Sequence, residues 1–345
     1  MARMTIHDIA KEAGVGKSTV SRVINGTGYV SDETRRKIEE VMKRNSYQPS
    51  SAARSLSKNE SDAIGIIIPE ANNPFFAEIL NGVSQAVDEN NFTLILCNTS
   101  NNIEKDFRSL EVMLRQRVKG LIFTPAADYS TSEQFDNLND LLRQLRCPVV
   151  MLDRSINNLT IDGVYSDNYN SAFMATEALI KAGHRKIGIV EGDLKLSIGH
   201  ERLAGYEKAL KTYGLKKDER FIVPGNFDAE TTYALMKELL DSGDLPTAFF
   251  ISNNLSCNGF LRAVFEKGMQ IPEDIAFIVF DKVIGQDVFN MKYSYVERDV
   301  QYMGRMAMRL LLKRFEKPDR TNECIIMEPT LKLLGSEKYV DRPYQ

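Results

Sequence analysis

The sequence predicts a small all-α head followed by a large α/β body made of two parallel-sheet halves. Residues 1–48 contain short segments with apolar side chains at helical spacing, separated by glycine and other turn residues. From residue 63 onward, apolar runs typical of strands alternate with helical patterns, and the first four runs begin about 28 residues apart. That spacing is typical of one strand and one helix in a right-handed parallel sheet. We therefore expect a head over residues 1–48, a linker over 49–62 and a body over 63–345.

Composition excludes several classes of protein. Hydrophobic residues make up 43% of the 345 residues and charged residues 26%, as in an ordinary globular chain. No apolar run approaches the roughly 18 residues that a membrane-spanning helix needs, and the N-terminus lacks the apolar core of a signal peptide. The cysteines Cys97, Cys147, Cys257 and Cys324 are far apart and form no C-x-x-C pair. These features predict a cytoplasmic protein without a membrane contact, disulfide framework, structural metal or cofactor.

Charge is distributed unevenly along the chain. Residues 1–58 contain eleven Lys or Arg and six Asp or Glu, a balance of +5, whereas the rest of the chain has a balance of −8. A basic head on an acidic body is expected where only the head contacts a polyanion such as a nucleic acid. The alternative is that the excess of basic residues only forms a solvated surface.

Three helices are expected in the head. Thr5 and Asp8 fit an N-cap with an acidic third residue, and Gly14 fits the residue that ends the first helix. The second helix should run from Lys17 to about Ile24. Ser31 should cap the third, which Pro49 should end. Their inner faces carry Ile6, Ile9, Ala10 and Ala13, then Val20, Val23 and Ile24, then Ile38, Val41 and Met42. A helix, a turn with glycine and a short polar-faced helix form a helix-turn-helix pattern.

The linker and the body follow in order. Ala52, Ala53 and Leu56 give the linker enough apolar character to form a short helix. Strands are expected at 64–68, 92–97, 120–123 and 149–152 in the first half, and at 186–190, 248–251 and 275–280 in the second. We expect the boundary between the halves at 158–163.

Sequence motifs of catalysis are missing. Gly16-Lys17-Ser18 lacks the first glycine of a phosphate-binding loop and lies in a helical segment, and no G-x-G-x-x-G follows a strand. The histidines His7, His184 and His200 have no metal-binding spacing. A binding protein is therefore favoured over an enzyme. Two alternatives remain: an enzyme, which would need a paired acid and base, and an exported solute-binding protein, which would need a signal peptide.

Several motifs together resemble the lactose-repressor (LacI/GalR) family of transcriptional regulators. In the head they are residues 5–15, residues 18–25, Tyr47-Gln48-Pro49 and Ala53-Arg54-Ser55-Leu56. In the body they are Asn73-Pro74-Phe75-Phe76, Asp153-Arg154, Asp167-Asn168, Gly183-His184-Arg185, Phe280-Asp281 and Glu328-Pro329-Thr330. The resemblance covers nearly the whole chain. It implies a DNA-binding repressor of carbohydrate-metabolism genes, with a body like a periplasmic sugar-binding protein.

The resemblance assigns roles to residues of the head. Lys17, Ser18 and Arg22 would reach base edges in the major groove, and Arg22 would bond guanine O6 and N7 together. For Lys17 and Arg22, a phosphate contact is the alternative. Thr5, Thr19 and Ser21 would contact backbone phosphates, which fix the register without reading the sequence. Asn25 and Tyr47 complete the expected DNA-binding set, Tyr47 by packing or by a phosphate contact.

The linker is expected to fold as a hinge helix on DNA. Two copies from a homodimer would pack there, with Ala53 and Arg54 at the DNA and Leu56 inserted between base steps of the minor groove. The alternative is that Leu56 only anchors the linker to the body. The partner would be pseudo-palindromic operator DNA, bound by a homodimer or by a tetramer.

The body is expected to hold a sugar-like effector between its two lobes. The resemblance places in this site Asn73, Pro74, Phe75, Asp153, Arg202, Phe227, Asn253, Asp281 and Arg298. Arg298 stands where the family commonly has Gln. Arg202 and Arg298 together would favour an anionic effector, such as a sugar acid or a sugar phosphate. The alternative for both arginines and for Asp281 is a salt bridge between the lobes or a cap at a strand end.

Overall fold

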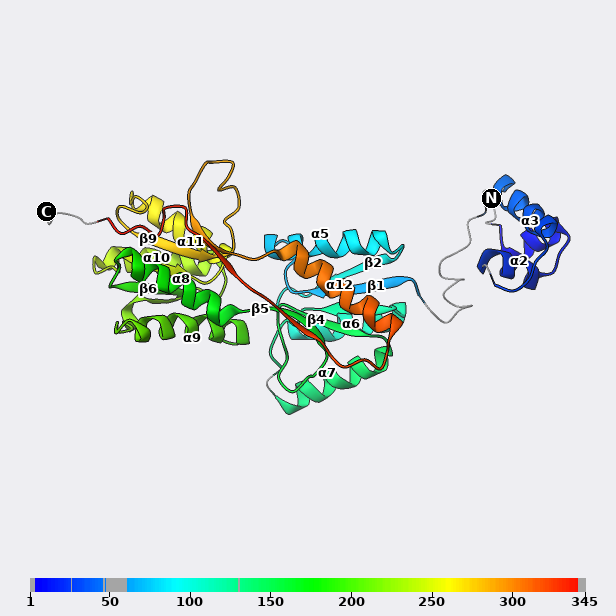
Figure 1. The fold of residues 1–345 in the computed structure, drawn as a ribbon, viewed down its shortest axis with the longest axis horizontal. Coiled ribbons are helices and arrows are strands. Elements are labelled where there is room, and N and C mark those ends of the chain that lie inside the picture. The colour runs from blue at the N-terminus through cyan, green and yellow to red at the C-terminus, as the bar shows by residue number, and fades with distance from the viewer. Residues whose placement is uncertain (1–3, 26, 46, 48–60, 130, 341–345) are drawn as a thin grey trace.

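The computed structural model describes residues 4–25, 27–45, 47, 61–129 and 131–340. Residues 48–60, which include the predicted hinge residues Ala53, Arg54 and Leu56, lie outside this description. The described residues form a three-helix head and an α/β body with two lobes (Figure 1). None of their helices is long and apolar enough to cross a membrane.

The head contains α1 (Ile6–Ala13), α2 (Lys17–Asn25) and α3 (Asp32–Arg44). Thr5 and Asp8 form the predicted capping box of α1, and Gly14 ends that helix in the left-handed conformation with φ of 67°. Ser31 caps α3 as expected. The prediction that Pro49 ends α3 is wrong, because the helix ends at Arg44. Asn45 caps it there and also donates a hydrogen bond to Glu12 on α1.

The first lobe is built on a six-stranded, fully parallel sheet with the order β11-β5-β4-β3-β1-β2. Its strands are β1 (Ala63–Ile68), β2 (Thr93–Asn98), β3 (Gly120–Phe123), β4 (Val149–Leu152), β5 (Asp162–Ser166) and β11 (Cys324–Met327). Its helices are α5 (Pro74–Glu89), α6 (Ile103–Gln116), α7 (Ser132–Leu145) and α12 (Val300–Glu316).

The second lobe repeats this plan with the strand order β12-β10-β9-β8-β6-β7, in which only β12 is antiparallel to its neighbour. Its strands are β6 (Ile187–Glu191), β7 (Ile222–Pro224), β8 (Ala248–Ile251), β9 (Ala276–Phe280), β10 (Ser294–Glu297) and β12 (Thr330–Lys332). Its helices are α8 (Asn168–Ala182), α9 (Ser197–Thr212), α10 (Ala229–Ser242) and α11 (Asn254–Glu266), with a short 3-10 turn at Glu219–Phe221.

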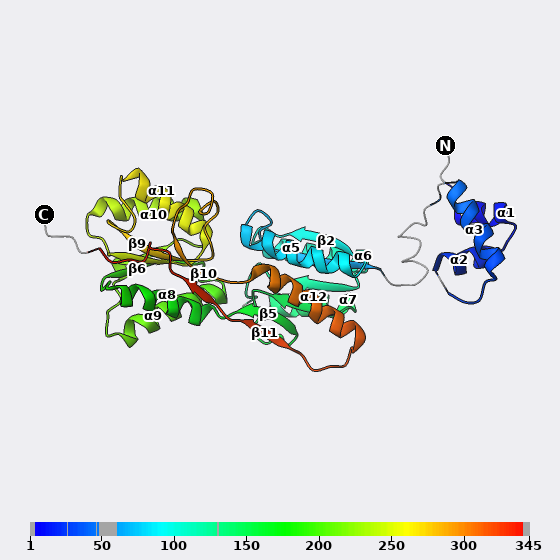
Figure 2. The same cartoon turned by 45° about the horizontal axis from the view of Figure 1, so that its top comes forward.

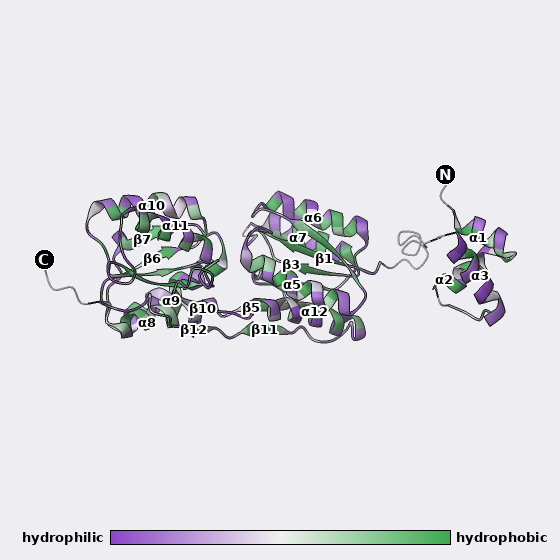
Figure 3. Ribbon diagram, turned by 90° about the horizontal axis from the view of Figure 1, so that it is seen from above, coloured by the Kyte–Doolittle hydropathy of each residue, from purple (hydrophilic) through white to green (hydrophobic). Residues whose placement is uncertain are grey.

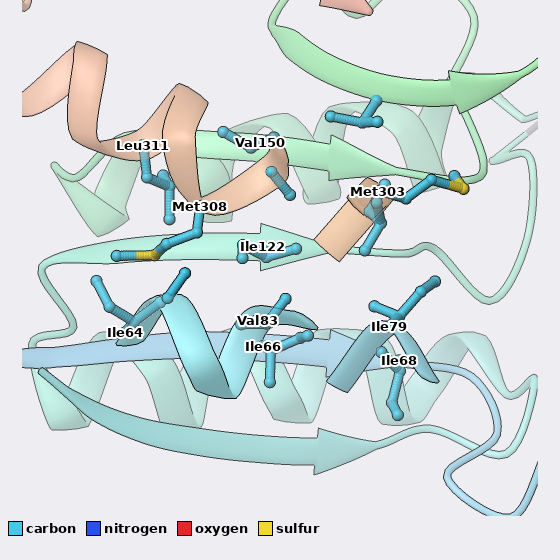
Figure 4. Packing of buried hydrophobic residues seen from close by; sticks show 14 of the residues in the cluster. Ile64, Ile66, Ile68, Ile79, Val83, Ile122, Val150, Met303, Met308 and Leu311 are labelled. Atoms are coloured by element: carbon cyan, nitrogen blue, oxygen red, sulfur yellow. The ribbon is translucent and has the colours of Figure 1, made fainter. Parts of the chain in front are cut away.

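Each central sheet is covered by helices on both faces (Figure 3). Its strands contribute apolar side chains to a core on each face. In β1, Ile64 and Ile66 pack under α5 and α12, whereas Ile67 points to the face covered by α6 and α7. Figure 4 shows the first of these cores, where Met308 and Leu311 of α12 meet β1, β3 and β4. Burial on both faces explains why the central strands are continuous apolar runs.

Helices α5 and α12 cross at unusually close range. A Cβ atom on Gly82 of α5 would lie 2.0 Å from the carbonyl oxygen of Gln301, and one on Gly304 of α12 would lie 2.4 Å from that of Ile79. No side chain larger than hydrogen fits at either position. The close contact fixes the start of α12 on the first lobe, directly after Arg298.

The chain crosses between the lobes three times within the described residues: after β5, between β10 and α12, and between β11 and β12 (Figures 1 and 2). The predicted boundary at 158–163 is therefore wrong. Strand β5 begins at Asp162, inside that range, and pairs with β4 of the first sheet, so the chain leaves the first lobe only after Ser166. Its run Asp162–Ser166 contains one aliphatic residue, which is too weak a pattern to be recognised as a strand.

Candidate functional site

Helix α2 presents a polar face formed by its first two turns. Lys17, Ser18 and Arg22 are exposed, and Thr19 and Ser21 are half-buried. Val20 on the opposite side is fully buried in the core of the head. Gly28 in the turn after α2 lies beside the Arg22 side chain, because a Cβ there would be 3.4 Å from the Arg22 Cδ atom. This face offers cationic and hydroxyl groups on a rigid helix.

The other predicted DNA-binding residues of the head have different surroundings. The hydroxyl of Thr5 donates to Asp8 at 2.6 Å as part of the capping box. Tyr47 packs against the core of the head, which is the packing alternative considered for it. Asn25 is the last residue of α2, and its side chain lies outside the described part of the structure. Tyr29, which sequence reasoning did not single out, is 91% exposed just beyond α2.

A cavity of about 400 Å³ lies between the lobes, where the carboxyl ends of strands from both sheets meet. Ligands of open parallel sheets bind at this end of the strands. Of the predicted effector-site residues, the structure brings together Asn73, Phe75, Asp153, Arg202, Phe227, Asn253, Asp281 and Arg298. Pro74 is the exception, because it is the first residue of α5 and lines a neighbouring cavity of about 760 Å³.

Two carboxylates approach the cavity from equivalent positions in the two lobes. Asp153 follows β4 and Asp281 follows β9, and both have left-handed backbone conformations, with φ of 63° and 69°. Each backbone amide donates to the next strand of its sheet, Asp153 to Val164 and Asp281 to Val296. Such conformations are uncommon outside glycine and cluster at functional sites.

Arg298 joins these carboxylates. Its Nε and Nη2 atoms donate to the two oxygens of Asp281 at 2.9 and 2.6 Å, and its Nη1 atom lies 3.3 Å from Asp153 and 3.0 Å from the Ser166 hydroxyl. Burial opposes the charge of Arg298, yet the two carboxylates hold its pKa above the ordinary value. The salt-bridge alternative therefore describes Arg298 in this structure.

Arg202 lies in the same cavity, and none of the described residues forms a salt bridge with it. It donates twice to the side-chain oxygen of Asn168, at 2.9 and 3.0 Å, and once to the carbonyl of Ser252. Its guanidinium carbon stacks 3.5 Å from the centre of the Phe280 ring. Burial, and next the charge of Arg298, lower the pKa of Arg202 to about 9. Arg202 therefore remains protonated at neutral pH, and it lines the cavity as a cationic hydrogen-bond donor.

Phe227 covers one end of the cavity. Its backbone is left-handed with φ of 60°, which is rare for an aromatic residue. Gly192 at the end of β6 makes room for it, because a Cβ there would lie 2.1 Å from the Phe227 ring. Asn253 supports the same loop by donating to the Phe227 carbonyl at 3.2 Å, and it also caps α11.

The charges of the cavity wall do not favour an anion. The wall contains five carboxylates, from Glu70, Asp153, Asp193, Asp228 and Asp281, and three guanidinium groups, from Arg154, Arg202 and Arg298. Arg298 is already balanced by two carboxylates. Of the two arginines that were predicted to favour an anionic effector, Arg298 is thus neutralised by carboxylates of the protein, and Arg202 alone keeps that role.

Several contributors were missed by sequence reasoning. Asn168 orients Arg202, and Ser166 contacts Arg298. Arg154 donates to Asn101 at 3.0 Å on the wall of the first lobe, and its Nε atom is buried without a protein partner. The motifs Asp153-Arg154 and Asp167-Asn168 already contained two of these residues. Their partners are 34 to 53 positions away, so no local spacing signals the contacts.

Comparisons with known proteins agree with this architecture. The model of bacterial regulatory proteins of the lacI family matches residues 5–50, and that of periplasmic binding proteins and the sugar binding domain of the LacI family matches residues 61–323. The HTH-type transcriptional repressor PurR of Pasteurella multocida (strain Pm70) is 33% identical over 97% of this chain and 98% of its own length.

Two solved structures show the same fold. A transcriptional regulator CelR–cellobiose complex superposes with a TM-score of 0.71 at 29% identity, covering 97% of this chain and 100% of its own. The lac repressor dimer bound to operator and the anti-inducer ONPF gives a TM-score of 0.85 at 22% identity, covering 98% and 100%. With both of its parts matched and a relative aligned along nearly its whole length, the chain belongs to the LacI family of bacterial regulatory proteins.

Proposed function

We propose that this chain is a transcriptional repressor that binds operator DNA as a homodimer and is controlled by a small hydroxyl-rich effector between its lobes. One observation carries the proposal: a head with an exposed, cationic helix face and a polar interlobe cavity occur in the same chain. An enzyme that uses Asp153 and Asp281 as acid and base has no role for the head, and Arg298 occupies both carboxylates.

The head supports DNA binding by the nature of its exposed groups. Arg22 and Lys17 project from α2, whose opposite face is fixed by the core of the head. An arginine on a recognition helix can donate twice to guanine, and hydroxyl groups nearby suit phosphate oxygens. Two heads related by a twofold axis double the number of base pairs that one short helix can read.

The cavity supports a neutral ligand that offers many hydroxyl groups. The carboxylate and amide oxygens of the wall can accept hydrogen bonds from ligand hydroxyl groups, and Arg202 can donate hydrogen bonds to the oxygens of those hydroxyl groups. The excess of carboxylates in the wall opposes a sugar acid or sugar phosphate. A regulator with 29% identity was solved as a cellobiose complex, which is consistent with a neutral carbohydrate here.

The body offers a surface for the second subunit. The loop between β9 and β10 exposes Ile284, Val288 and Phe289 by 62%, 82% and 71%, and it projects from the second lobe (Figure 1). Clustered apolar side chains of this kind mark protein interfaces.

Fluorescence anisotropy with labelled duplexes tests the proposal. A pool of randomised pseudo-palindromic DNA is first enriched for sequences that the protein binds. The affinity for the most enriched duplex is then compared with that for a scrambled duplex at the same salt concentration. We expect submicromolar, sequence-dependent binding that changes on addition of at least one neutral sugar from a panel that also contains sugar acids and sugar phosphates. Equal affinity for the enriched and scrambled duplexes would refute the proposal that the chain binds a specific operator. A response to anionic sugars alone would refute the neutral-effector part.

A further inference from the structure

Arg298 links three strand ends that belong to two different sheets. Asp281 follows β9 of the second lobe, and Asp153 and Ser166 lie at the ends of β4 and β5 of the first lobe. All three contacts converge on one guanidinium whose side chain is 2% exposed. The planar fork of arginine suits this geometry, because its donors point to two sides at once.

Two aromatic rings, one from each lobe, lie close to the same guanidinium. Its carbon is 4.2 Å from the centre of the Phe75 ring on the first lobe and 4.8 Å from that of Phe280 on the second. Cation–π contacts and charge pairs from both lobes therefore hold the same group. Part of the aromatic surface that a sugar ring would cover is already covered by the chain itself.

Arg298 also separates two cavities. The interlobe cavity of about 400 Å³ and the neighbouring cavity of about 760 Å³ share only four wall residues, Phe75, Asn254, Asp281 and Arg298. Three of these four belong to the bridge just described. The bridge thus forms the partition between the cavities.

We propose that Arg298 acts as an internal bridge that holds the two lobes together when no effector is bound and closes the effector cavity toward its neighbour. This inference rests on the proposed effector control. Three crossing segments connect the lobes, so a hinge motion about them is the movement open to the body. Because Arg298 contacts residues of both lobes, it limits that motion. An effector can shift the equilibrium only by binding the bridged and unbridged arrangements with different affinities.

The substitution Arg298→Gln tests the bridge in the full chain without any small molecule. Gln cannot contact both carboxylates, so amide hydrogen exchange should become at least about tenfold faster in the crossing segments 166–168 and 297–300. Operator affinity without effector should change by roughly five-fold or more, because the lobe arrangement is no longer fixed. Arg309→Gln is the matched control, since Arg309 is an exposed arginine of α12 outside the cavity, and it should leave both quantities unchanged.

Two milder variants cover the case in which Arg298→Gln does not fold. Arg298→Lys keeps the charge but not the fork, and Ser166→Ala removes one of the contacts, so both should accelerate exchange in the same segments by a smaller factor. Exchange at the control level in every folded variant of the bridge would overturn the proposal. If the wild-type chain binds no operator at all, the proposed function fails, whereas the exchange measurement still decides whether the bridge exists.

Discussion

Arg202 and Arg298 lie in one cavity wall, but their charges are balanced in different ways. Arg298 has two carboxylate partners, whereas Arg202 has an amide oxygen, a carbonyl oxygen and an aromatic face. The sequence contained both arginines and suggested that both could face an anion. The sequence could not show that Arg298 pairs with Asp153, because the two residues are 145 positions apart. They meet only because the chain crosses between the lobes.

Asp106 carries a testable pH dependence in the first lobe. It is fully buried on α6 and accepts hydrogen bonds from the Ala126 amide and the Tyr129 hydroxyl, both at 2.7 Å. Burial raises its pKa to about 6, from 3.8. The folded state thus binds the proton more tightly than the unfolded state, so this group lowers stability as pH rises from about 4 to about 6, by at most about 3 kcal/mol.

The substitution Asp106→Asn should remove this dependence while keeping an oxygen acceptor. Relative to wild type, the variant should gain apparent melting temperature as pH rises from 4 to 7. Circular dichroism is the suitable probe, because the chain has no Trp. Asp244→Asn is the control of opposite sign, since hydrogen bonding by Lys186 lowers the pKa of exposed Asp244. A constant difference between the Asp106→Asn variant and wild type across this range would contradict the assignment.

At the scale of elements, regular patterns were predictable and irregular ones were not. The helices of the head follow from caps such as Thr5 and Ser31, which are local signals. The central strands follow from apolar runs such as Ala63–Ile68, buried throughout. Five strands are short or mixed in polarity: β5, β7, β10, β11 and β12. Their extended conformation depends more on pairing with neighbouring strands than on the pattern of their own residues.

Helix α2 gives the prediction for DNA recognition. Arg22→Ala should flatten the base preference at one position of each half-site, because a bidentate contact to guanine is worth roughly 1 to 3 kcal/mol against the wrong base. The affinities for the enriched duplex and for its single-base variants measure this preference. Arg44→Ala is the control, since Arg44 lies at the end of α3 and pairs with Glu12. A uniform loss of affinity for all duplexes would show that Arg22 contacts a phosphate.

At the scale of the whole molecule, the exposed loop between β9 and β10 predicts how subunits associate. Replacing Val288 and Phe289 together by Asp places charges on side chains that are 82% and 71% exposed, so folding of the subunit should be preserved. Light scattering at micromolar concentration should show a monomer where the wild type is a dimer, and operator affinity should fall sharply. The matched control replaces Leu333 and Leu334, which are also exposed on the second lobe. A double variant that remains dimeric would place the interface elsewhere.

Effector control must act across the whole chain, from the cavity to the head. A coupling of about 1 to 3 kcal/mol is typical, so an effector should change operator affinity by roughly 5- to 150-fold, and operator must change effector affinity by the same factor. Arg202→Ala should abolish both changes, because it removes the cationic donor of the cavity wall that has no carboxylate partner among the described residues, while operator binding without effector survives. Lys208→Ala, on an exposed position of the same helix, is the control.

Calorimetry with and without operator measures one side of this linkage, and anisotropy with and without effector measures the other. Agreement of the two factors in the wild type shows that one equilibrium connects the sites. Arg202→Lys separates charge from geometry: it keeps the cation but cannot donate twice to Asn168, so effector binding should weaken rather than vanish. If Arg202→Ala retained the full response to effector, Arg202 would not be an effector contact, and other polar groups of the cavity wall, such as Asn73, Asp153 or Asn253, would have to bind the ligand.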